Sequence, residues 1–236
     1  MPIYRLTDEI IFPPPEYAEE NGLLAVGGDL SEERLLLAYA MGIFPWYSED
    51  SPILWWSPDP RLILIPGELK ISRSLKQTIK KGIYEVTMDK AFAQVVINCA
   101  EVHRKKDGDT WITQDMLDAY RRLHDSGVAH SVESWYRGEL SGGLYGVALG
   151  GAFFGESMFT RRTDASKVAF VNLVQYLVQR DFELIDCQVT TEHLMSFGAK
   201  RVPRSKFLEI LRRALRRPTR RGIWGIPPST YGVYER

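Results

Sequence analysis

The spacing of apolar residues changes along this 236-residue chain, and the change falls near residue 60. Beyond that point apolar residues recur at helical spacing in three segments, 71–82, 90–106 and 113–127. Short apolar runs with a period of two predict four strands, 84–89, 129–136, 139–149 and 152–159. Glycine-containing turns at Arg137-Gly138 and Gly150-Gly151 would join the last three strands into an antiparallel meander.

The segments after the meander predict the fold class. A long buried helix over 163–181, a strand over 182–189 and a final helix over 204–217 follow in order. Three antiparallel strands, a helix, a strand and a helix is the order of the acetyltransferase-like (GNAT) fold. We therefore expect an α+β protein whose C-terminal domain is GNAT-like, with a mostly antiparallel sheet.

The first sixty residues have a different texture. Residues 12–31 are rich in proline and glycine and are expected to be loop, and Ser31 is the expected N-cap of a short helix that Gly42 ends. Residues 42–61, "GIFPWYSEDSPILWWSPDPR", then hold four prolines and three of the six tryptophans. So many prolines predict irregular backbone. We expect a small N-terminal domain over 1–60 and a second domain over 61–236.

The three tryptophans of this stretch allow two interpretations. Trp46, Trp55 and Trp56 could form an aromatic plug between domains, or flat rings on a stiff loop could stack on a nucleobase. From these residues alone, both interpretations stay open.

Composition excludes several classes of protein. The chain is 44% hydrophobic and 25% charged, typical of a globular protein, and no apolar run is long enough to span a membrane. We expect no signal peptide, because the N-terminus lacks a basic flank followed by an apolar core. Cys99 and Cys187 lie in apolar segments and are expected to be buried thiols in a reducing cytoplasm. The histidines lack metal-ligand spacing, so no metal is expected.

A net charge of zero conceals a strong polarity. Residues 1–60 hold eleven acidic and two basic residues, whereas residues 197–236 hold eleven basic and two acidic ones. The two ends should therefore meet different partners or each other. Six arginines fall within residues 212–221, and both a solvated helix face and a phosphate-binding surface fit that pattern.

Candidate chemistry lies on two predicted strands. In "ELIDCQV" the alternation places Asp186 and Gln188 on one face, and a carboxylate in an apolar strand needs a partner or a cleft. Asp186 could be a buried structural acid or a general base. Glu156 interrupts the third meander strand, and it would meet these two residues if both strands border one cleft. Nearby apolar residues are then either pocket walls or ordinary core.

Missing motifs narrow the chemistry further. The link "TRRTDASK" between the meander and the long helix has no glycine, so it lacks the turn that would hold the pyrophosphate of acetyl-CoA. The chain has no P-loop, no dinucleotide fingerprint and no GxSxG nucleophile motif. A carboxylate and an amide without a cofactor motif suit acyl transfer from a donor that is already activated.

Several motifs in fixed order resemble one family. They are "NGLLAVGGDLS", "GIFPWYSEDSPILWWSPDPR", "TWIT", "GESMF", "ASK", "LIDCQV" and "FGAKRVPR", and together they are similar to the bacterial leucyl/phenylalanyl-tRNA–protein transferases over residues 20–210. The resemblance implies transfer of leucine or phenylalanine, less readily methionine, from aminoacyl-tRNA to the N-terminal Arg or Lys of a protein. That reaction marks the acceptor for degradation in the bacterial N-degron pathway. The resemblance also implies a cytoplasmic monomer without metal, cofactor or membrane contact.

The resemblance assigns roles to residues. It makes Asp186 the base or electrostatic orienter of the acceptor amine, with Gln188 in support and Glu156 holding donor or acceptor. The walls of the donor pocket would be Leu144, Phe153, Met158, Leu173 and Ile185. Trp46 and Trp111 would flank the terminal adenosine of tRNA. A phosphate-binding cluster would comprise Arg73, Lys76, Lys80 and Lys81. Leu144 and Leu173 stand where the family pattern has Met and Phe, so the preference between donors stays open.

Two other functions remain as alternatives. The basic C-terminal region and the aromatic stretch would also suit a non-catalytic RNA-binding module, which has no need of Asp186, Gln188 and Glu156. An aminoacyltransferase of the same fold could instead act on a lysine side chain of a cell-wall peptide.

Overall fold

The computed structural model describes residues 3–107 and 110–225 of the chain. The predicted second domain extends to residue 236, so its last segment, 226–236, lies outside the described residues. The α-helices are α1 (Glu32–Ala40), α2 (Arg73–Lys80), α3 (Phe92–Asp107), α4 (Gln114–Asp125), α5 (Ala165–Val178), α6 (Glu192–Ser196) and α7 (Arg204–Ala214). The strands are β1 (Tyr4–Leu6), β2 (Leu23–Gly27), β3 (Phe44–Pro45), β4 (Leu54–Trp56), β5 (Arg61–Leu64), β6 (Glu85–Met88), β7 (Ala129–Tyr136), β8 (Glu139–Leu149), β9 (Ala152–Thr160), β10 (Leu184–Gln188) and β11 (Lys200–Val202).

A four-stranded sheet of order β1-β2-β4-β3 forms the N-terminal part of the molecule. The expectation of loop over residues 12–31 and 42–61 is wrong where β2, β3 and β4 form. Proline is tolerated because Pro45 lies on β3, the edge strand, where a missing N–H breaks no inner ladder. Ser31 caps α1 as predicted, since its hydroxyl accepts from the Arg34 N–H at 3.3 Å.

The second sheet has seven strands in the order β11-β5-β10-β9-β8-β7-β6. The predicted meander is confirmed: β7, β8 and β9 pair antiparallel, and Arg137, Gly138 and Gly150 have the positive φ that tight turns require. The helix α5 then crosses over, and β10 adds parallel to β9. Every other pair in this sheet is antiparallel, which confirms the α+β fold class.

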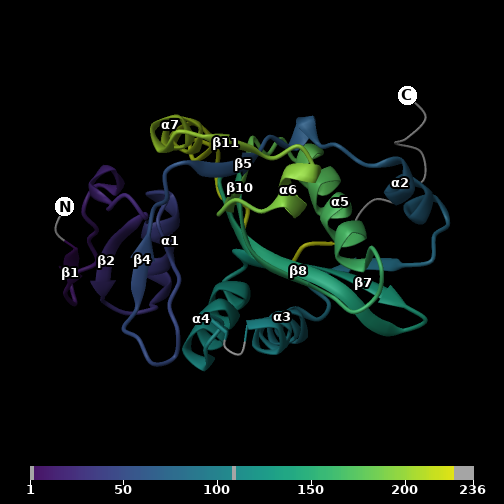
Figure 1. Cartoon of the computed structure of the whole chain (residues 1–236), viewed down its shortest axis with the longest axis horizontal. Helices are drawn as coiled ribbons and strands as arrows, with labels where there is room; N and C mark the ends of the chain where they lie inside the picture. Colours follow the sequence, from purple (N-terminus) through teal and green to yellow (C-terminus); the bar gives the residue numbers. More distant parts are fainter. Residues whose placement is uncertain (1–2, 108–109, 226–236) are drawn as a thin grey trace.

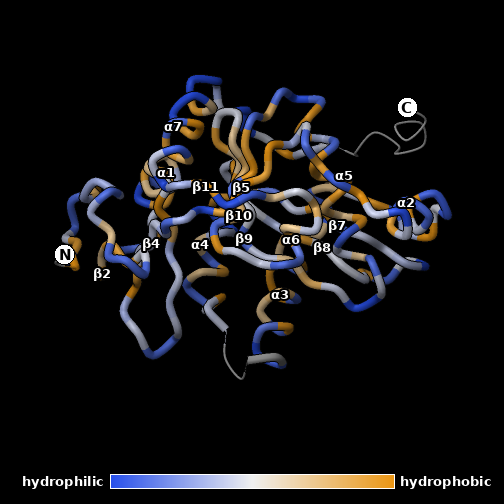
Figure 2. The backbone as a smooth tube through the Cα atoms, turned by 45° about the horizontal axis from the view of Figure 1, so that its top comes forward, coloured by the Kyte–Doolittle hydropathy of each residue, from blue (hydrophilic) through white to orange (hydrophobic). Residues whose placement is uncertain are grey.

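Helices cover both faces of the large sheet. Figure 1 shows α3 and α4 beneath it, and α5, α6 and α2 above it. The helix α5 fits its place, because eleven of its residues are buried between the sheet and the outer helices. Figure 2 shows hydrophobic colour concentrated along α5 and the strands under it, while outer loops are hydrophilic. Each face therefore has a hydrophobic core of its own.

The chain passes from the small sheet to the large one between Trp56 and Arg61. The hydrophobic cluster of the small sheet nevertheless continues into the α3–α4 face, so Trp55 and Tyr120 belong to one core. A domain division at residue 60 stays a prediction. The helix α6 was not predicted, because its five residues are too few for a periodic pattern. Thr191 is its N-cap, and the Thr191 hydroxyl accepts from the Leu194 N–H.

Candidate active site

A gap opens in the large sheet where its two parallel strands separate. β10 pairs with β9 only from Leu184 to Asp186, opposite Ala152 to Phe154. β9 then runs on to Thr160, paired to β8 on its other side. Backbone N–H and C=O groups on the β10 side of β9 thereby lose their strand partner, and this is where a ligand can bind.

A β-bulge places Glu156 at this gap. Gly146 of β8 pairs with Gly155, and Tyr145 pairs with Ser157, so Glu156 is the extra residue. Glycine is required opposite the bulge, because a Cβ at Gly146 would lie 2.2 Å from the carbonyl oxygen of Phe154. The bulge interrupts the regular alternation of side chains along β9. The Glu156 side chain therefore points toward α1 and α4.

Three donors hold the carboxylate of Glu156. Its Oε1 accepts from the Tyr39 hydroxyl at 2.8 Å and from Gln188 Nε2 at 3.0 Å, and its Oε2 accepts from the Tyr120 hydroxyl at 2.6 Å. The two tyrosine oxygens lie 2.6 Å apart. Tyr39 comes from α1 and Tyr120 from α4, so both parts of the molecule build this network.

Glu156 has an unusual acidity. Burial raises its pKa to about 7 although the hydroxyls of Tyr120 and Tyr39 stabilise the charged form, and the nearby charge of Asp186 raises it further. Burial also raises the pKa of Tyr39 and of Tyr120 well above the usual value, so both hydroxyls stay protonated as donors. A partly exposed carboxyl that titrates near neutrality can exchange a proton with a bound amine.

Asp186 is held quite differently. Its Oδ1 accepts from Arg61 Nε at 2.8 Å and its Oδ2 from Arg61 Nη2 at 2.7 Å, and both side chains are fully buried. The guanidinium carbon of Arg61 lies 4.7 Å from the ring centre of Phe44 and 4.6 Å from that of Phe207. Asp186 is therefore half of a bidentate buried ion pair with aromatic rings around its cation.

The side chain of Asp186 stabilises the backbone conformation of Gln188. Its φ of 59° is left-handed, which is uncommon for a residue with a side chain. The N–H of Gln188 donates to Asp186 Oδ1 at 2.9 Å, and this short-range bond stabilises the turn. The turn aims the Gln188 amide across the gap at Glu156. The structure thus brings together Asp186, Gln188 and Glu156, as the sequence suggested for two strands bordering one cleft.

The five predicted pocket walls lie on the opposite side of the sheet from α3. Leu144, Phe153, Leu173 and Ile185 are buried in one hydrophobic cluster, and Met158 packs against it partly exposed. Register explains the grouping: Leu144 pairs with Met158 and Phe153 with Ile185, beside the point where β9 and β10 separate.

The tryptophans of residues 42–61 differ in exposure. Trp55 is fully buried and its Nε1 donates to the Gly27 carbonyl at 2.8 Å. Trp56 donates from Nε1 to the Trp46 carbonyl at 2.7 Å, and its ring centre lies 5.8 Å from that of Trp46. Trp46 itself is 45% exposed. Trp111, the other predicted adenosine-binding residue, is partly buried and lies 6.4 Å from the His103 ring.

The segments that carry Trp46 and Trp111 lie beside each other. The hydroxyl of Tyr47 is 3.3 Å from that of Thr113, which links the residue after Trp46 to the N-cap of α4. The two predicted adenosine-binding tryptophans therefore stand on adjoining segments, and their role stays a prediction.

The predicted phosphate-binding cluster lies on and next to α2. Arg73, Lys76, Lys80 and Lys81 are all exposed. Within residues 3–107 and 110–225, none of the four has a carboxylate partner. Ser72 caps the helix by accepting from the Leu75 N–H at 3.2 Å. These cations are available to phosphates, although their role stays a prediction.

The arginines of residues 212–221 are mostly neutralised. Arg213 and Arg217 both bind Glu183, Arg221 binds Glu32, and Arg212 lies 3.6 Å from Glu16. Glu16 and Glu32 belong to the acidic N-terminal segment. The oppositely charged ends of the chain therefore meet each other.

Sequence reasoning missed three residues of the site. Tyr39 and Tyr120 carry no local signal, because each reads as an apolar residue on a helix face. Arg61 did carry one: it opens the apolar run "RLILIP", while Asp186 interrupts another apolar strand. Two opposite charges in two buried strands predict a pair.

Two features are absent from the described ranges. Every helix within residues 3–107 and 110–225 is too short or too polar to span a membrane. The same residues contain no group of three His, Cys, Asp or Glu side chains placed to hold a metal ion.

Comparison with known proteins gives concordant matches. The family model for leucyl/phenylalanyl-tRNA protein transferase matches residues 63–212, and the model for its N-terminal domain matches residues 28–59. The chain is 64% identical over 211 residues to the leucyl/phenylalanyl-tRNA–protein transferase of Syntrophobacter fumaroxidans, covering 89% of this chain and 90% of the relative. It is 62% identical over 226 residues to that of an Anaeromyxobacter species, covering 96% of each.

Among solved structures, an aminoglycoside acetyltransferase from a soil metagenomic sample aligns with a TM-score of 0.40 and 12% identity. The alignment covers 50% of this chain and 86% of that protein. So distant a likeness leaves the site to be argued from the chain's own geometry.

Proposed function

The chain belongs to the leucyl/phenylalanyl-tRNA protein transferase family, and we propose that it moves leucine or phenylalanine from aminoacyl-tRNA to the N-terminal Arg or Lys of a protein. Methionine would be a poorer donor. The product would enter degradation through the bacterial N-degron pathway, and the enzyme would act as a cytoplasmic monomer. The observation that carries this proposal is the gap between β9 and β10, where Glu156 and Gln188 meet.

The reaction needs positioning and one proton transfer. The neutral α-amine of the acceptor attacks the ester carbonyl of the aminoacyl-tRNA, a C–N bond forms, and the C–O bond to the tRNA 3′-oxygen breaks. The amine gives up a proton and the departing 3′-oxygen gains one. Because the ester is already activated, holding the two reactants together supplies much of the rate.

We assign Asp186 the orienting role and Gln188 the contact with substrate. Both oxygens of Asp186 accept hydrogen bonds from Arg61, so neither oxygen faces the gap where the amine would bind. Asp186 also fixes the backbone of Gln188, because its Oδ1 accepts from the Gln188 N–H at 2.9 Å. The Gln188 amide then lies at the gap, where it can bind the reacting amine or carbonyl.

Glu156 is the better proton acceptor. It is partly exposed at the gap, and neutral donors surround it instead of a cation. Its pKa of about 7 lies close to that of a peptide α-amine, which suits proton exchange between the two groups. Its ionised form would also attract the cationic side chain of an acceptor that begins with Arg or Lys.

The donor would bind along the sheet. Its apolar side chain would enter beside Met158, the partly exposed member of the cluster with Leu144, Phe153, Leu173 and Ile185. Trp46 and Trp111 would stack on the terminal adenosine, since aromatic rings accept a base without reading its sequence. The exposed cations of α2 would contact phosphates of the acceptor stem.

The test uses leucyl-tRNA, phenylalanyl-tRNA and a peptide that begins with Arg. Mass spectrometry should show a mass increase of one residue on the peptide, and a matched peptide with an acetylated N-terminus should show none. No product with either donor would refute the proposal. A product on the lysine side chain of a muropeptide would favour the cell-wall reaction instead.

A further inference from the structure

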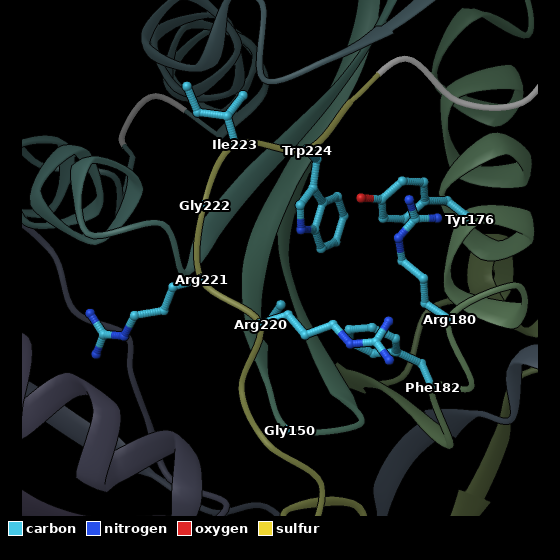
Figure 3. A pocket seen from close by; sticks show the side chains of 10 residues that line it. Gly150, Tyr176, Arg180, Phe182, Arg220, Arg221, Gly222, Ile223 and Trp224 are labelled. Carbon is cyan, nitrogen blue, oxygen red and sulfur yellow. The ribbon is translucent and has the colours of Figure 1, made fainter.

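A pocket lies away from the gap between β9 and β10. It has a volume of about 150 Å³. It lies between the turn that joins β8 to β9, the C-terminal end of α5 and the chain after α7, and its lining includes Gly150, Tyr176, Arg180, Phe182, Arg220 and Trp224. Figure 3 shows the aromatic side chains of Tyr176, Phe182 and Trp224 around the pocket.

The chain after α7 is firmly docked here. The Trp224 N–H donates to Asp89 Oδ2 at 2.7 Å, and the Trp224 ring stacks on His130 at 3.9 Å between ring centres. The Gly222 N–H donates to the Gly127 carbonyl at 3.1 Å, where a side chain at Gly127 would leave no room. The pocket is therefore a fixed feature of the fold.

Two guanidinium groups face this pocket. Arg180 stacks 3.6 Å from the ring centre of Tyr176, and Figure 3 shows Arg220 reaching across toward Phe182. Neither arginine has a carboxylate partner among residues 3–107 and 110–225, and the pocket lining includes no acidic side chain from these residues. Arg221, by contrast, points away from the pocket and binds Glu32. Within the charged segment 212–221, Arg220 is thus the arginine that is both unpaired and turned into the pocket.

The hydroxyl of Tyr176 is a third polar group at the same place. The Tyr176 side chain is buried, and no acceptor for its hydroxyl occurs among the described residues. Burial raises the pKa of this hydroxyl and the nearby carboxylate of Asp89 raises it too, whereas the cations of Arg180 and Arg220 lower it. The hydroxyl therefore remains a protonated donor beside two cations.

We propose that this pocket binds a phosphate group between the guanidinium groups of Arg180 and Arg220, with the Tyr176 hydroxyl as a third donor. Planar guanidinium forks match the oxygens of a phosphate, and the stacking of Arg180 on Tyr176 fixes the orientation of one fork. The phosphate is either part of a free phosphorylated molecule or a phosphodiester of RNA. The proposal rests on these pocket residues, which have no assigned role in the proposed transfer reaction.

The experiment is calorimetric titration of the full chain with inorganic pyrophosphate and, separately, with deacylated tRNA. Arg180→Ala and Arg220→Ala should each weaken binding of the true ligand about tenfold, since each removes a charge-assisted contact. Arg216→Ala is the matched control: Arg216 is exposed, lies on the same segment and has no carboxylate partner among residues 3–107 and 110–225, but it does not line the pocket. Its affinity should change less than about twofold.

The results separate the two sources of phosphate. Selective weakening of tRNA binding by the two pocket variants would assign the phosphate to RNA, and selective weakening of pyrophosphate binding alone would assign it to a free molecule. Equal weakening in Arg216→Ala would show general electrostatic attraction and overturn the proposal. So would the absence of any saturable binding by the native chain. Tyr176→Phe, which keeps the ring, should weaken binding about threefold.

Discussion

Two carboxylates on neighbouring strands contrast in what surrounds them. Asp186 on β10 is fully buried and shares both oxygens with one guanidinium, while Glu156 on β9 is partly exposed and accepts from two tyrosines and one amide. A cation neutralises an acid and fixes it, whereas neutral donors leave its charge free to vary. Burial raises the pKa of Glu156 and its neutral donors oppose that shift only in part, whereas Asp186 is held by the cation of Arg61. Burial and partner together decide which acid holds the site together and which can exchange a proton.

Removing the charge of Asp186 should have the largest effect. Asp186→Asn leaves the buried guanidinium of Arg61 without its anion, so the free energy of unfolding should fall by about 3–5 kcal/mol. Transfer activity should fall about 10²-fold even where the protein remains folded, because the single amide oxygen left by the substitution is shared between Arg61 and the Gln188 N–H, which loosens the Gln188 turn. Denaturant unfolding and transfer kinetics check this. Asp29→Asn is the control, since Asp29 binds buried Arg34 from an exposed position, and about 1 kcal/mol is expected there. Equal losses in both variants would contradict the comparison.

Replacing the whole ion pair should separate its two contributions. In Arg61→Met with Asp186→Leu, apolar side chains take the place of both charges among the rings of Phe44 and Phe207. Most of the stability lost in Asp186→Asn, about 3–5 kcal/mol, should return. Activity should stay low, because Gln188 remains unsupported. Recovery of both stability and activity in the double variant would show that Asp186 serves the fold alone.

The role of Glu156 should appear as a pH effect. Its carboxylate is the active form, so its contribution is present above pH 7 and is lost as the pH falls through the pKa of about 7. The ratio of the native transfer rate to the Glu156→Gln rate should therefore rise as the pH is raised. The midpoint of this rise should lie near pH 7, and the ratio should reach about 10² at high pH. Taking the ratio cancels the titration of the acceptor amine, which is common to both proteins. A ratio independent of pH would remove Glu156 from proton transfer.

The two tyrosines should give the smallest effects. Tyr39→Phe and Tyr120→Phe each remove one donor to the Glu156 carboxylate, which should raise its pKa above 7 and cost about 1 kcal/mol of folding free energy. The midpoint of the pH profile should shift upward in both variants. Tyr47→Phe, whose hydroxyl contacts Thr113 and not Glu156, should leave that midpoint unchanged. An unshifted midpoint in both tyrosine variants would show that these hydroxyls do not set the pKa of Glu156.

Much of the fold follows from local sequence signals. The meander turns at Gly138 and Gly150 and the helix cap at Ser31 are encoded within a few residues, and the structure confirms them. The strands of the small sheet were missed for the opposite reason. Their partners lie far apart in sequence, and short segments rich in proline resemble loops until the pairing of β2 with β4 is known.

The site was predictable in part. Asp186, Gln188 and Glu156 stood out because each interrupts an apolar strand. The pairing of Asp186 with Arg61 needs knowledge of which strands are adjacent, and the contact of Tyr39 with Glu156 crosses 117 positions of sequence. Charge density alone left the arginines open: the arginine-dense segment 212–221 is largely paired with acids, whereas the sparser cations of α2 have no carboxylate partner among residues 3–107 and 110–225.

The position of Tyr39 has a consequence for how the enzyme is made. Tyr39 lies in the first sixth of the chain, and Gln188 is synthesised long after it, yet both bind the same carboxylate. A chain that ends before Gln188 cannot assemble this network, and neither can a fragment that begins at Arg61. The network therefore forms only after Gln188 has been synthesised. Two separately expressed fragments, divided near residue 60, could serve as a complementation reporter in which activity shows that the fragments have associated.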